Sequence, residues 1–339
     1  MNSKKIIISL GVIVVVALTI FVAERLSNQA PPDHKLRFFP GVTESSISGI
    51  HISEGENSVI LTKDGNRWFV KSGDEEHKTE SFENADSESP ERFLADSASV
   101  QVVLEKIVNL RKNTLVSENP ERQSSFEVDE ESGVFVSMWD EREKSLGAFR
   151  IGKTAIDWNT HYVRQMGSNS VYSIAGGVRY PFFSEVNRWR DRRIMSFNRN
   201  DVLRINIDKQ GEEEFTIEKV GQEWMITHPV SHVANIDTVA SILATATTLR
   251  TSGFENELTD YDEMGLTEPE LRFSVDLSDG TRREVIVGDE NEKTQRWTKA
   301  EGRNDLFLIS TFDFNRLNRG LENVKAAAAE VIESPDELM

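Results

Sequence analysis

The sequence carries the same order of local patterns twice, and this internal repeat constrains the fold more than any other feature. Trp68 follows a Gly turn at Gly65, and Trp224 follows a Gly turn at Gly221. An apolar, alternating segment interrupted by a Gly turn is typical of a β-hairpin. We interpret Trp68 and Trp224 as core anchors of two equivalent hairpins, with ligand stacking as the alternative role for the rings.

A helix is expected after each hairpin. Asp96 and Asn235 are residue types that favour the N-cap position, and apolar residues at helical spacing follow each of them. The apolar positions are Val100, Val103, Leu104, Ile107 and Val108 in one helix, and Val239, Ile242, Leu243, Ala246 and Leu249 in the other.

The match continues to the end of each copy. Ile151-Gly152-Lys153 matches Val287-Gly288-Asp289, with further strands on both sides. A closing helix is expected through Phe183, Val186 and Trp189, and again through Phe314, Leu317 and Leu321. The predicted fold class is therefore α+β: two tandem repeats, each an antiparallel sheet covered by two helices.

The N-terminal segment 6–23 contains no charged residue and is rich in Ile and Val. At about 1.5 Å per residue it would be long enough to span a bilayer core of about 30 Å as a helix. Lys4 and Lys5 precede it, so the positive-inside rule favours a cytoplasmic N-terminus and an exported C-terminal region. A cleaved signal peptide is the alternative, but the apolar run is long and lacks a small-residue cleavage pattern.

These features predict the following organisation along the chain. The predicted parts are a cytoplasmic N-terminus over 1–5, a transmembrane helix over 6–23, a stalk over 24–45, a first repeat over 46–195 with an acidic loop over 72–96, a second repeat over 196–325, and an acidic tail over 326–339.

Composition excludes several classes of function. The net charge of −18 argues against nucleic acid as a partner, because phosphate binding requires Lys and Arg. The chain has no cysteine, which excludes disulfides and thiolate chemistry. No nucleotide-binding, hydrolase or zinc-protease motif is present, so we expect no cofactor, no metal and no enzymatic activity.

Two charged segments stand out from this background. Residues 72–96 hold nine acidic residues against Lys78 and Arg92. A solvated loop is favoured there over a calcium site, because the alternating ligands of a calcium loop are absent. Residues 187–199 are basic instead. Internal pairing of these charges is the favoured interpretation, and contact of Arg188, Arg190, Arg192 and Arg193 with a partner or an anionic ligand is the alternative.

His228 and His232 have the spacing of a zinc-binding pair on a helix. Pro229 lies between them and is incompatible with that helix, and no third ligand is evident. A metal site is therefore not expected.

Taken in order, these patterns resemble the bacterial family known as domain of unknown function 4340. The residues that carry the resemblance are the KDGNRW hairpin, the LADSASV helix start, the IGK strand and the segment NRWRDRRIMSFNRNDVLRINI, and it extends over about residues 46–325 in two tandem copies. The resemblance implies a membrane-anchored protein associated with ABC transporters of the gliding-motility type. It implies no catalytic residue.

From the sequence we therefore expect a non-catalytic accessory or scaffold protein of the cell envelope. Its location would be the bacterial inner membrane, single-pass, with the C-terminal region on the periplasmic side. Its partner would be a membrane protein complex, such as an ABC transporter permease. The alternative is an exported ligand-binding module that uses a cleft between the two repeats.

Overall fold

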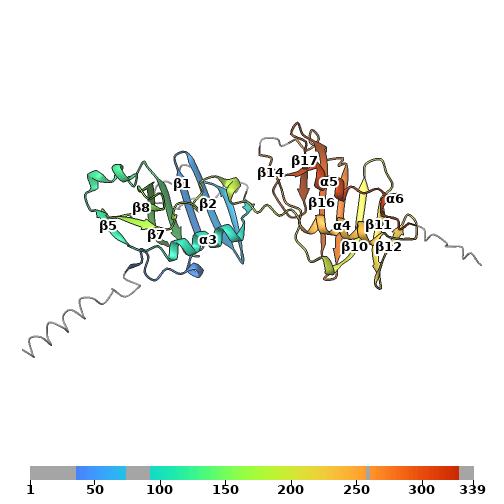
Figure 1. Cartoon of the computed structure of the whole chain (residues 1–339), viewed down its shortest axis with the longest axis horizontal. Helices are drawn as coiled ribbons and strands as arrows, with labels where there is room; N and C mark the ends of the chain where they lie inside the picture. The colour runs from blue at the N-terminus through green and yellow to red at the C-terminus, as the bar shows by residue number, and fades with distance from the viewer. Residues whose placement is uncertain (1–35, 74–91, 257–259, 328–339) are drawn as a thin grey trace, which may run out of the picture. The chain divides into compact units, whose positions relative to one another are not determined.

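The computed structural model describes residues 36–73, 92–256 and 260–327. These residues form two nine-stranded sheets of antiparallel pairs, shown in Figure 1. The chain also divides into two compact units. One runs to Ser58 and resumes over Gln101–Ser184, and the other consists of Val59–Val100 and the chain from Glu185 onward.

The first sheet has the strand order β4-β3-β2-β1-β6-β7-β8-β9-β5. Its strands are β1 (Gly49–Glu54), β2 (Asn57–Asp64), β3 (Arg67–Ser72), β4 (Phe93–Leu94), β5 (Thr114–Ser117), β6 (Val134–Trp139), β7 (Ser145–Thr154), β8 (Thr160–Gln165) and β9 (Val171–Ala175). At its centre Ile50 of β1 lies opposite Met138 of β6. Both side chains are buried.

The second sheet has the order β13-β12-β11-β10-β15-β16-β17-β18-β14, which is the order of the first sheet with new numbers. Its strands are β10 (Val202–Lys209), β11 (Phe215–Val220), β12 (Glu223–His228), β13 (His232–Val233), β14 (Gly253–Phe254), β15 (Leu271–Leu277), β16 (Arg282–Glu290), β17 (Gln295–Ala300) and β18 (Phe307–Ser310). The two sheets therefore repeat one topology.

Four α-helices and five short 3₁₀ turns complete the described residues. The helices are α3 (Ser97–Val108), α4 (Ile236–Thr247), α5 (Thr311–Leu317) and α6 (Leu321–Val324), and the turns are Glu44–Ser46, Pro120–Arg122, Ser124–Phe126, Val186–Arg188 and Arg199–Asp201. The apolar positions predicted for the helices after each hairpin are all buried. In the second sheet they form one core with strand residues such as Phe273 and Val275.

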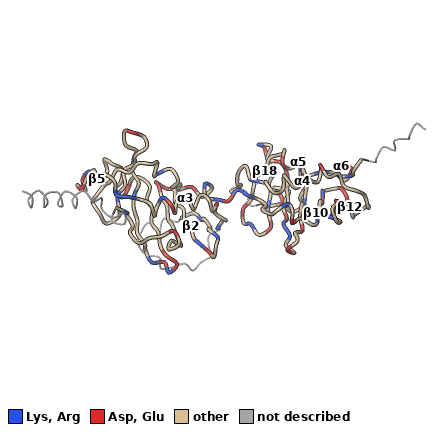
Figure 2. The backbone as a smooth tube through the Cα atoms, turned by 60° about the horizontal axis from the view of Figure 1, so that its bottom comes forward, with Lys and Arg blue, Asp and Glu red and all other residues tan. Residues whose placement is uncertain are grey.

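The two faces of the second sheet differ in composition. The face under α4 is apolar, whereas Arg204 on the other face pairs with Glu218 and Asp276 on neighbouring strands. An antiparallel sheet with one covered and one solvated face shows this alternation. Figure 2 shows basic and acidic residues interspersed along both units.

Gly152 and Gly288 occupy matching positions in the sequence repeat. A glycine is required at both for the same structural reason. A Cβ on Gly152 would lie 2.0 Å from the carbonyl oxygen of Phe126, and one on Gly288 would lie 2.0 Å from that of Met264. In both sheets a connecting segment passes directly over this glycine. Phe126 belongs to a small cluster with Val128 and Val171, and Met264 belongs to one with Leu266 and Leu306.

The predicted membrane architecture requires correction. The segment 6–23 lies outside the described residues, and within 36–73, 92–256 and 260–327 no helix is long and apolar enough to cross a membrane. The longest helices there, α3 and α4, have 12 residues each, or about 18 Å against a bilayer core of about 30 Å. This finding contradicts the predicted fold class with a transmembrane helix. It also contradicts the inner-membrane, single-pass location that depends on that helix.

The closing helix predicted through Phe183, Val186 and Trp189 is also wrong. Only the 3₁₀ turn Val186–Arg188 forms there. After β9 the backbone passes through Gly176 and Gly177 at φ +98° and +59°, which a right-handed helix does not allow. After β18 the side chain of Ser310 instead caps α5 by accepting from the backbone N–H of Asp313 at 3.1 Å. The fold is thus more β-rich than the predicted α+β arrangement.

Two predicted surface segments are only partly described. Most of the acidic loop 72–96 and of the tail 326–339 lies outside the described residues. The stalk predicted over 24–45 is described from residue 36, where Phe38 and Phe39 are 1% and 5% exposed. Phe38 also donates its backbone N–H to the Leu110 carbonyl at 2.9 Å, so these residues are part of the folded unit.

Candidate functional site

Arg190 is the buried arginine of the basic segment 187–199. The residue is 2% exposed, and its guanidinium carbon lies 3.7 Å from the centre of the Phe93 ring and 3.8 Å from that of Phe254. Aromatic faces at this distance attract a cation electrostatically. The guanidinium is therefore enclosed between two rings rather than presented to solvent.

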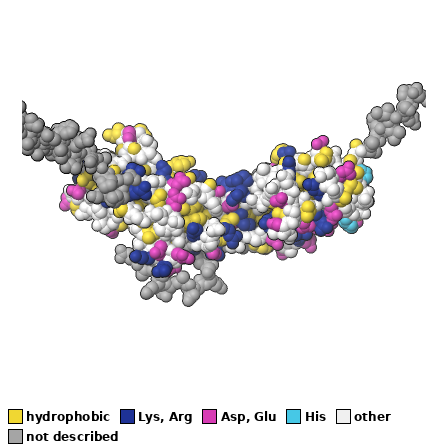
Figure 3. Space-filling view, turned by 90° about the horizontal axis from the view of Figure 1, so that it is seen from below, with side chains coloured by type: hydrophobic (Ala, Val, Ile, Leu, Met, Phe, Trp, Pro, Cys, Tyr) yellow, Lys and Arg dark blue, Asp and Glu magenta, His cyan; other side chains and the backbone are white. Residues whose placement is uncertain are grey.

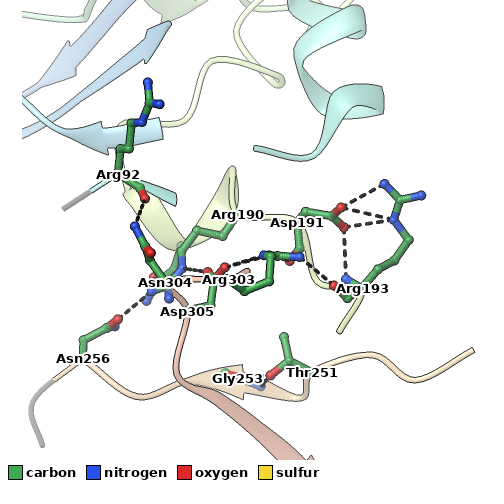
Figure 4. A network of polar contacts seen from close by, with 11 residues as sticks. Arg92, Arg190, Asp191, Arg193, Thr251, Gly253, Asn256, Arg303, Asn304 and Asp305 are labelled. Carbon is green, nitrogen blue, oxygen red and sulfur yellow. Dashed lines mark hydrogen bonds and ion pairs between the residues drawn. The ribbon is translucent and has the colours of Figure 1, made fainter. Parts of the chain in front are cut away.

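Asp305 supplies the opposite charge. Arg190 Nε donates to Asp305 Oδ1 at 2.8 Å, and the two side chains are 1% and 0% exposed. Arg190 Nη1 donates to the side-chain oxygens of Asn187 and Asn256 at 3.0 and 2.7 Å (Figure 4). Burying two charges is costly, and additional hydrogen bonds of this kind help the pair to offset that cost.

Arg303 connects Asp305 to the neighbouring backbone. Its guanidinium Nη2 lies 2.7 Å from Asp305 Oδ2. The same guanidinium donates to the carbonyl oxygens of Asp191 and Arg193 at 3.0 and 2.9 Å. The buried carboxylate is thus bonded by two arginines, one on each of its oxygens.

Asp191 is the second buried carboxylate of the network. Arg193 donates to it from its backbone N–H at 3.0 Å and from Nη2 at 2.8 Å. Burial by itself raises the pKa of the Asp191 carboxyl. The hydrogen bonds and charge of Arg193, with the charge of Arg303, outweigh that effect and hold the pKa below its ordinary value of 3.8. Asp191 is therefore ionised at neutral pH.

Backbone pairing fixes the segment that carries these side chains. Asp96 donates its N–H to the Trp189 carbonyl at 2.6 Å, and Asp191 donates to the Leu94 carbonyl at 2.8 Å. Ala95 and Arg190 face each other in the resulting antiparallel bridge. The segment is consequently extended, and the fully buried Trp189 anchors it from the adjacent position.

The four predicted contact residues do not form one surface. Arg190 is buried, whereas Arg188, Arg192 and Arg193 are exposed. Arg193 is paired with Asp191, and Arg192 Nη2 donates to the Ser252 carbonyl at 3.1 Å. The structure therefore places the charge of Arg190 inside the fold, and contact of Arg188, Arg192 and Arg193 with a partner or an anion stays a prediction.

Sequence reasoning did not find the partners of Arg190. Asp305 and Asn256 lie far away in the chain, and Asp305 is one of 57 acidic residues with no local pattern to distinguish it. Phe93 and Phe254 belong to two-residue strands, β4 and β14, that are too short to give a periodic signal. Long-range pairing places these groups, so a local pattern could not have identified them.

The residues predicted to anchor the two repeats occupy matching positions. Trp68 is 7% exposed, and Trp224 packs against the second core. Asp96 Oδ1 accepts from the Ser99 N–H at 2.8 Å at the start of α3. Asn235 Oδ1 accepts from the N–H groups of Asp237 and Thr238, each at 3.0 Å, at the start of α4.

The arrangement offers no reactive group. The guanidinium of Arg190 is neutralised by Asp305, and Asp191 is bonded to Arg193. Among the residues that the structure describes, no group of three or more His, Cys, Asp or Glu side chains could hold a metal ion. His228 ends β12 and His232 begins β13, and the latter Nδ1 lies 2.8 Å from the Val233 carbonyl oxygen.

The fold and this network define a β-rich protein of two topologically equivalent sheets with a closed, structural cluster of charges. The profile of a family described as Domain of unknown function (DUF4340) matches residues 86–232. That range includes α3 and β5 to β9 of the first sheet and β10 to β12 of the second. The match indicates no catalytic family. No curated protein and no solved structure matches the chain significantly.

Proposed function

We propose that the chain is a non-catalytic scaffold protein that acts by binding another protein. The observation that carries this proposal is the closed state of the Arg190 network. The opposite charges of this network are used in internal pairing, and the side chains of Arg190 and Asp305 are 1% and 0% exposed. A site that binds and transforms a charged substrate needs such groups to face it.

The two sheets support the same proposal. Their shared strand order gives two rigid platforms, and binding residues are often carried on loops held by a rigid scaffold. The duplication of the family domain itself, as two tandem copies over 46–195 and 196–325, belongs to this proposal. The expected partner, a permease of an ABC-type transporter, also belongs to this proposal and is the first candidate to test.

The test is copurification of the full-length protein. A tagged chain is crosslinked mildly in its native cells, purified, and sized before and after the crosslink is reversed. We expect a second protein in fixed stoichiometry, identified by mass spectrometry and confirmed by reverse tagging of that protein. A chain that migrates alone, with turnover of generic ester, peptide or glycan substrates, would refute the proposal.

A further inference from the structure

The turn between β7 and β8 exposes two large apolar side chains. Ile156 is 96% exposed and Trp158 is 86% exposed, with Asp157 between them. In Figure 3 hydrophobic side chains gather on a projecting lobe of the surface around an acidic one. Single exposed apolar residues are common on proteins, but a Trp and an Ile at the tip of one turn require a reason.

The second sheet contains the equivalent turn, between β16 and β17. In the first turn Ala155 donates its N–H to the Thr160 carbonyl at 2.7 Å, and Trp158 donates to Ala155 at 3.1 Å. In the second, Asn291 donates to Gln295 at 2.7 Å, and Thr294 donates to Asn291 at 3.0 Å. The first turn is one residue longer, and the hydrogen-bond pattern is otherwise shared.

The backbone conformation of the two turns agrees as well. Trp158 has φ +59° and Thr294 has φ +56°, both in the left-handed region. The tip residues of the second turn are Glu292, Lys293 and Thr294, all exposed. The turn therefore forms with a wholly polar tip, and the fold does not require apolar residues at Ile156 and Trp158.

The backbone conformation at Trp158 is unfavourable for a tryptophan, so the fold itself does not account for this residue. A bulky side chain at positive φ is strained, and Gly or Asn would fit that position better. With 86% of its surface exposed, Trp158 also gains little burial in return. A residue that strains the turn and contributes little to the core is most simply explained by a contact outside the chain.

The segment after β9 is tied to this turn and carries a further exposed aromatic residue. The N–H groups of Gly176 and Gly177 donate to the Asn159 carbonyl at 3.0 and 3.1 Å, which ties the segment after β9 to this turn. Tyr180 follows in that segment and is 77% exposed. We refer to Ile156 and Trp158 as the apolar tip.

The chemistry of the tip selects the kind of partner. Asp157 accepts hydrogen bonds from the Thr160 N–H and hydroxyl at 3.0 and 2.5 Å, so it carries a fixed negative charge between the two apolar side chains. A carboxylate at that place disfavours insertion into hydrocarbon. A chain of net charge −18 also disfavours a second copy of itself as the occupant.

We propose that the apolar tip docks into an apolar pocket, rimmed by Lys or Arg, on the partner protein of the scaffold. This inference rests on the proposed function and names its binding surface. A projecting Trp is a common anchor of protein interfaces, because it buries a large area in one pocket.

The experiment measures the affinity between the purified partner, as identified by reversible crosslinking and reverse tagging, and the full-length chain. The key variant is the double replacement Ile156→Glu with Trp158→Thr, which introduces the residue types of Glu292 and Thr294 and keeps Asp157. Leu115→Thr is the matched control, because it removes another apolar side chain, 48% exposed, from the same unit. Denaturant unfolding of all three proteins verifies that the fold is intact.

We expect the double variant to bind at least about 30-fold more weakly than the wild type, as for the loss of an anchor residue. The Leu115 variant should bind within about 3-fold of the wild type, as for a peripheral residue. The wild-type affinity should fall as salt is raised, because the rim of the pocket is basic. Equal affinity of the wild type and the double variant, or an affinity independent of salt, would overturn the inference while leaving the scaffold function intact.

Two other occupants are tested with the same proteins. Self-association in sedimentation that the double variant abolishes would assign the tip to a second copy of the chain. Binding to neutral phosphatidylcholine vesicles that the double variant abolishes would assign it to lipid. Either result overturns the inference. Absence of any wild-type partner would instead refute the proposed function and the inference together.

Discussion

Arg190 and Asp305 form an ion pair that is closed to solvent, with 2.8 Å between Nε and Oδ1 and side-chain exposures of 1% and 0%. The pair is bracketed by the rings of Phe93 and Phe254. Because neither charge can reach water, the energetic consequence of removing one partner differs greatly from that of removing a surface pair.

Replacement of Asp305 by Asn should lower the free energy of unfolding by about 3–5 kcal/mol, because Arg190 then keeps a buried charge without its counter-ion. Urea denaturation of the full-length protein measures this. The matched control is Glu218→Gln, which removes the partner of Arg204 in a pair whose side chains are 47% and 31% exposed. Its expected cost is less than about 1 kcal/mol. Similar costs for the two variants would contradict the closed state of the Arg190 network.

Asp191 should make stability depend on pH in a defined direction. Its folded-state pKa is lowered, so its contribution is present above the unfolded pKa of about 3.9 and is lost as the pH falls through the folded value. Asp191→Asn should therefore cost about 1–2 kcal/mol at pH 7. The difference between wild type and variant should shrink below about pH 4. Unfolding curves of both proteins between pH 3 and pH 7 measure it, and a difference that grows on acidification would show the opposite sign.

Gly152→Ala and Gly288→Ala should each destabilise the chain by about 1–3 kcal/mol, as overpacking against fixed backbone does. Each Cβ would lie 2.0 Å from a carbonyl oxygen, which cannot rotate away as a side chain can. Gly253→Ala is the control, since its Cβ would lie 3.6 Å from Leu308 Cδ1, an ordinary contact. Thermal unfolding compares the three, and unaffected stability of the Gly152 variant would mean that the overlying segment moves freely.

Trp158→Asn should raise the free energy of unfolding by about 0.5–1 kcal/mol. Asn adopts φ near +59° with less strain than Trp, and an 86% exposed ring contributes little burial. The measurement is denaturant unfolding beside Ile156→Ala, which leaves the strained residue in place and should be neutral. A loss of stability in the Asn variant would show that the Trp158 ring packs on the fold after all.

Local patterns predicted the parts of the fold that depend on local physics. The buried faces of α3 and α4, the cap at Asn235 and the hairpin positions of Trp68 and Trp224 follow from spacing and residue type. The repeated Gly152 and Gly288 were recognised as equivalent. The reason for a glycine at both positions is a carbonyl oxygen that lies above each, and this is evident only in the three-dimensional structure.

The predictions that failed depend on neighbours distant in sequence. Phe183, Val186 and Trp189 have a helical spacing, but the Trp189 carbonyl accepts from the Asp96 N–H, and only one 3₁₀ turn forms before it. The ion pair of Arg190 was also beyond a local pattern, because Asp305, its counter-ion, lies 115 positions further along the chain. Charge pattern along a sequence does not reveal which charges a fold will enclose.

The strand order has a consequence for the time course of synthesis. The central strand β1 hydrogen-bonds to β6, so Ile50 must wait for Met138 to leave the ribosome. The edge strand β5 must likewise wait for β9, since Leu115 pairs with Tyr172. Until then the earlier strands can pair only with near neighbours, as in the β2–β3 hairpin, and distant pairings of this kind slow folding. The nascent chain must therefore leave one hydrogen-bonding edge of β1 unpaired while more than half of the first sheet is synthesised, a period in which a chaperone would have its greatest effect.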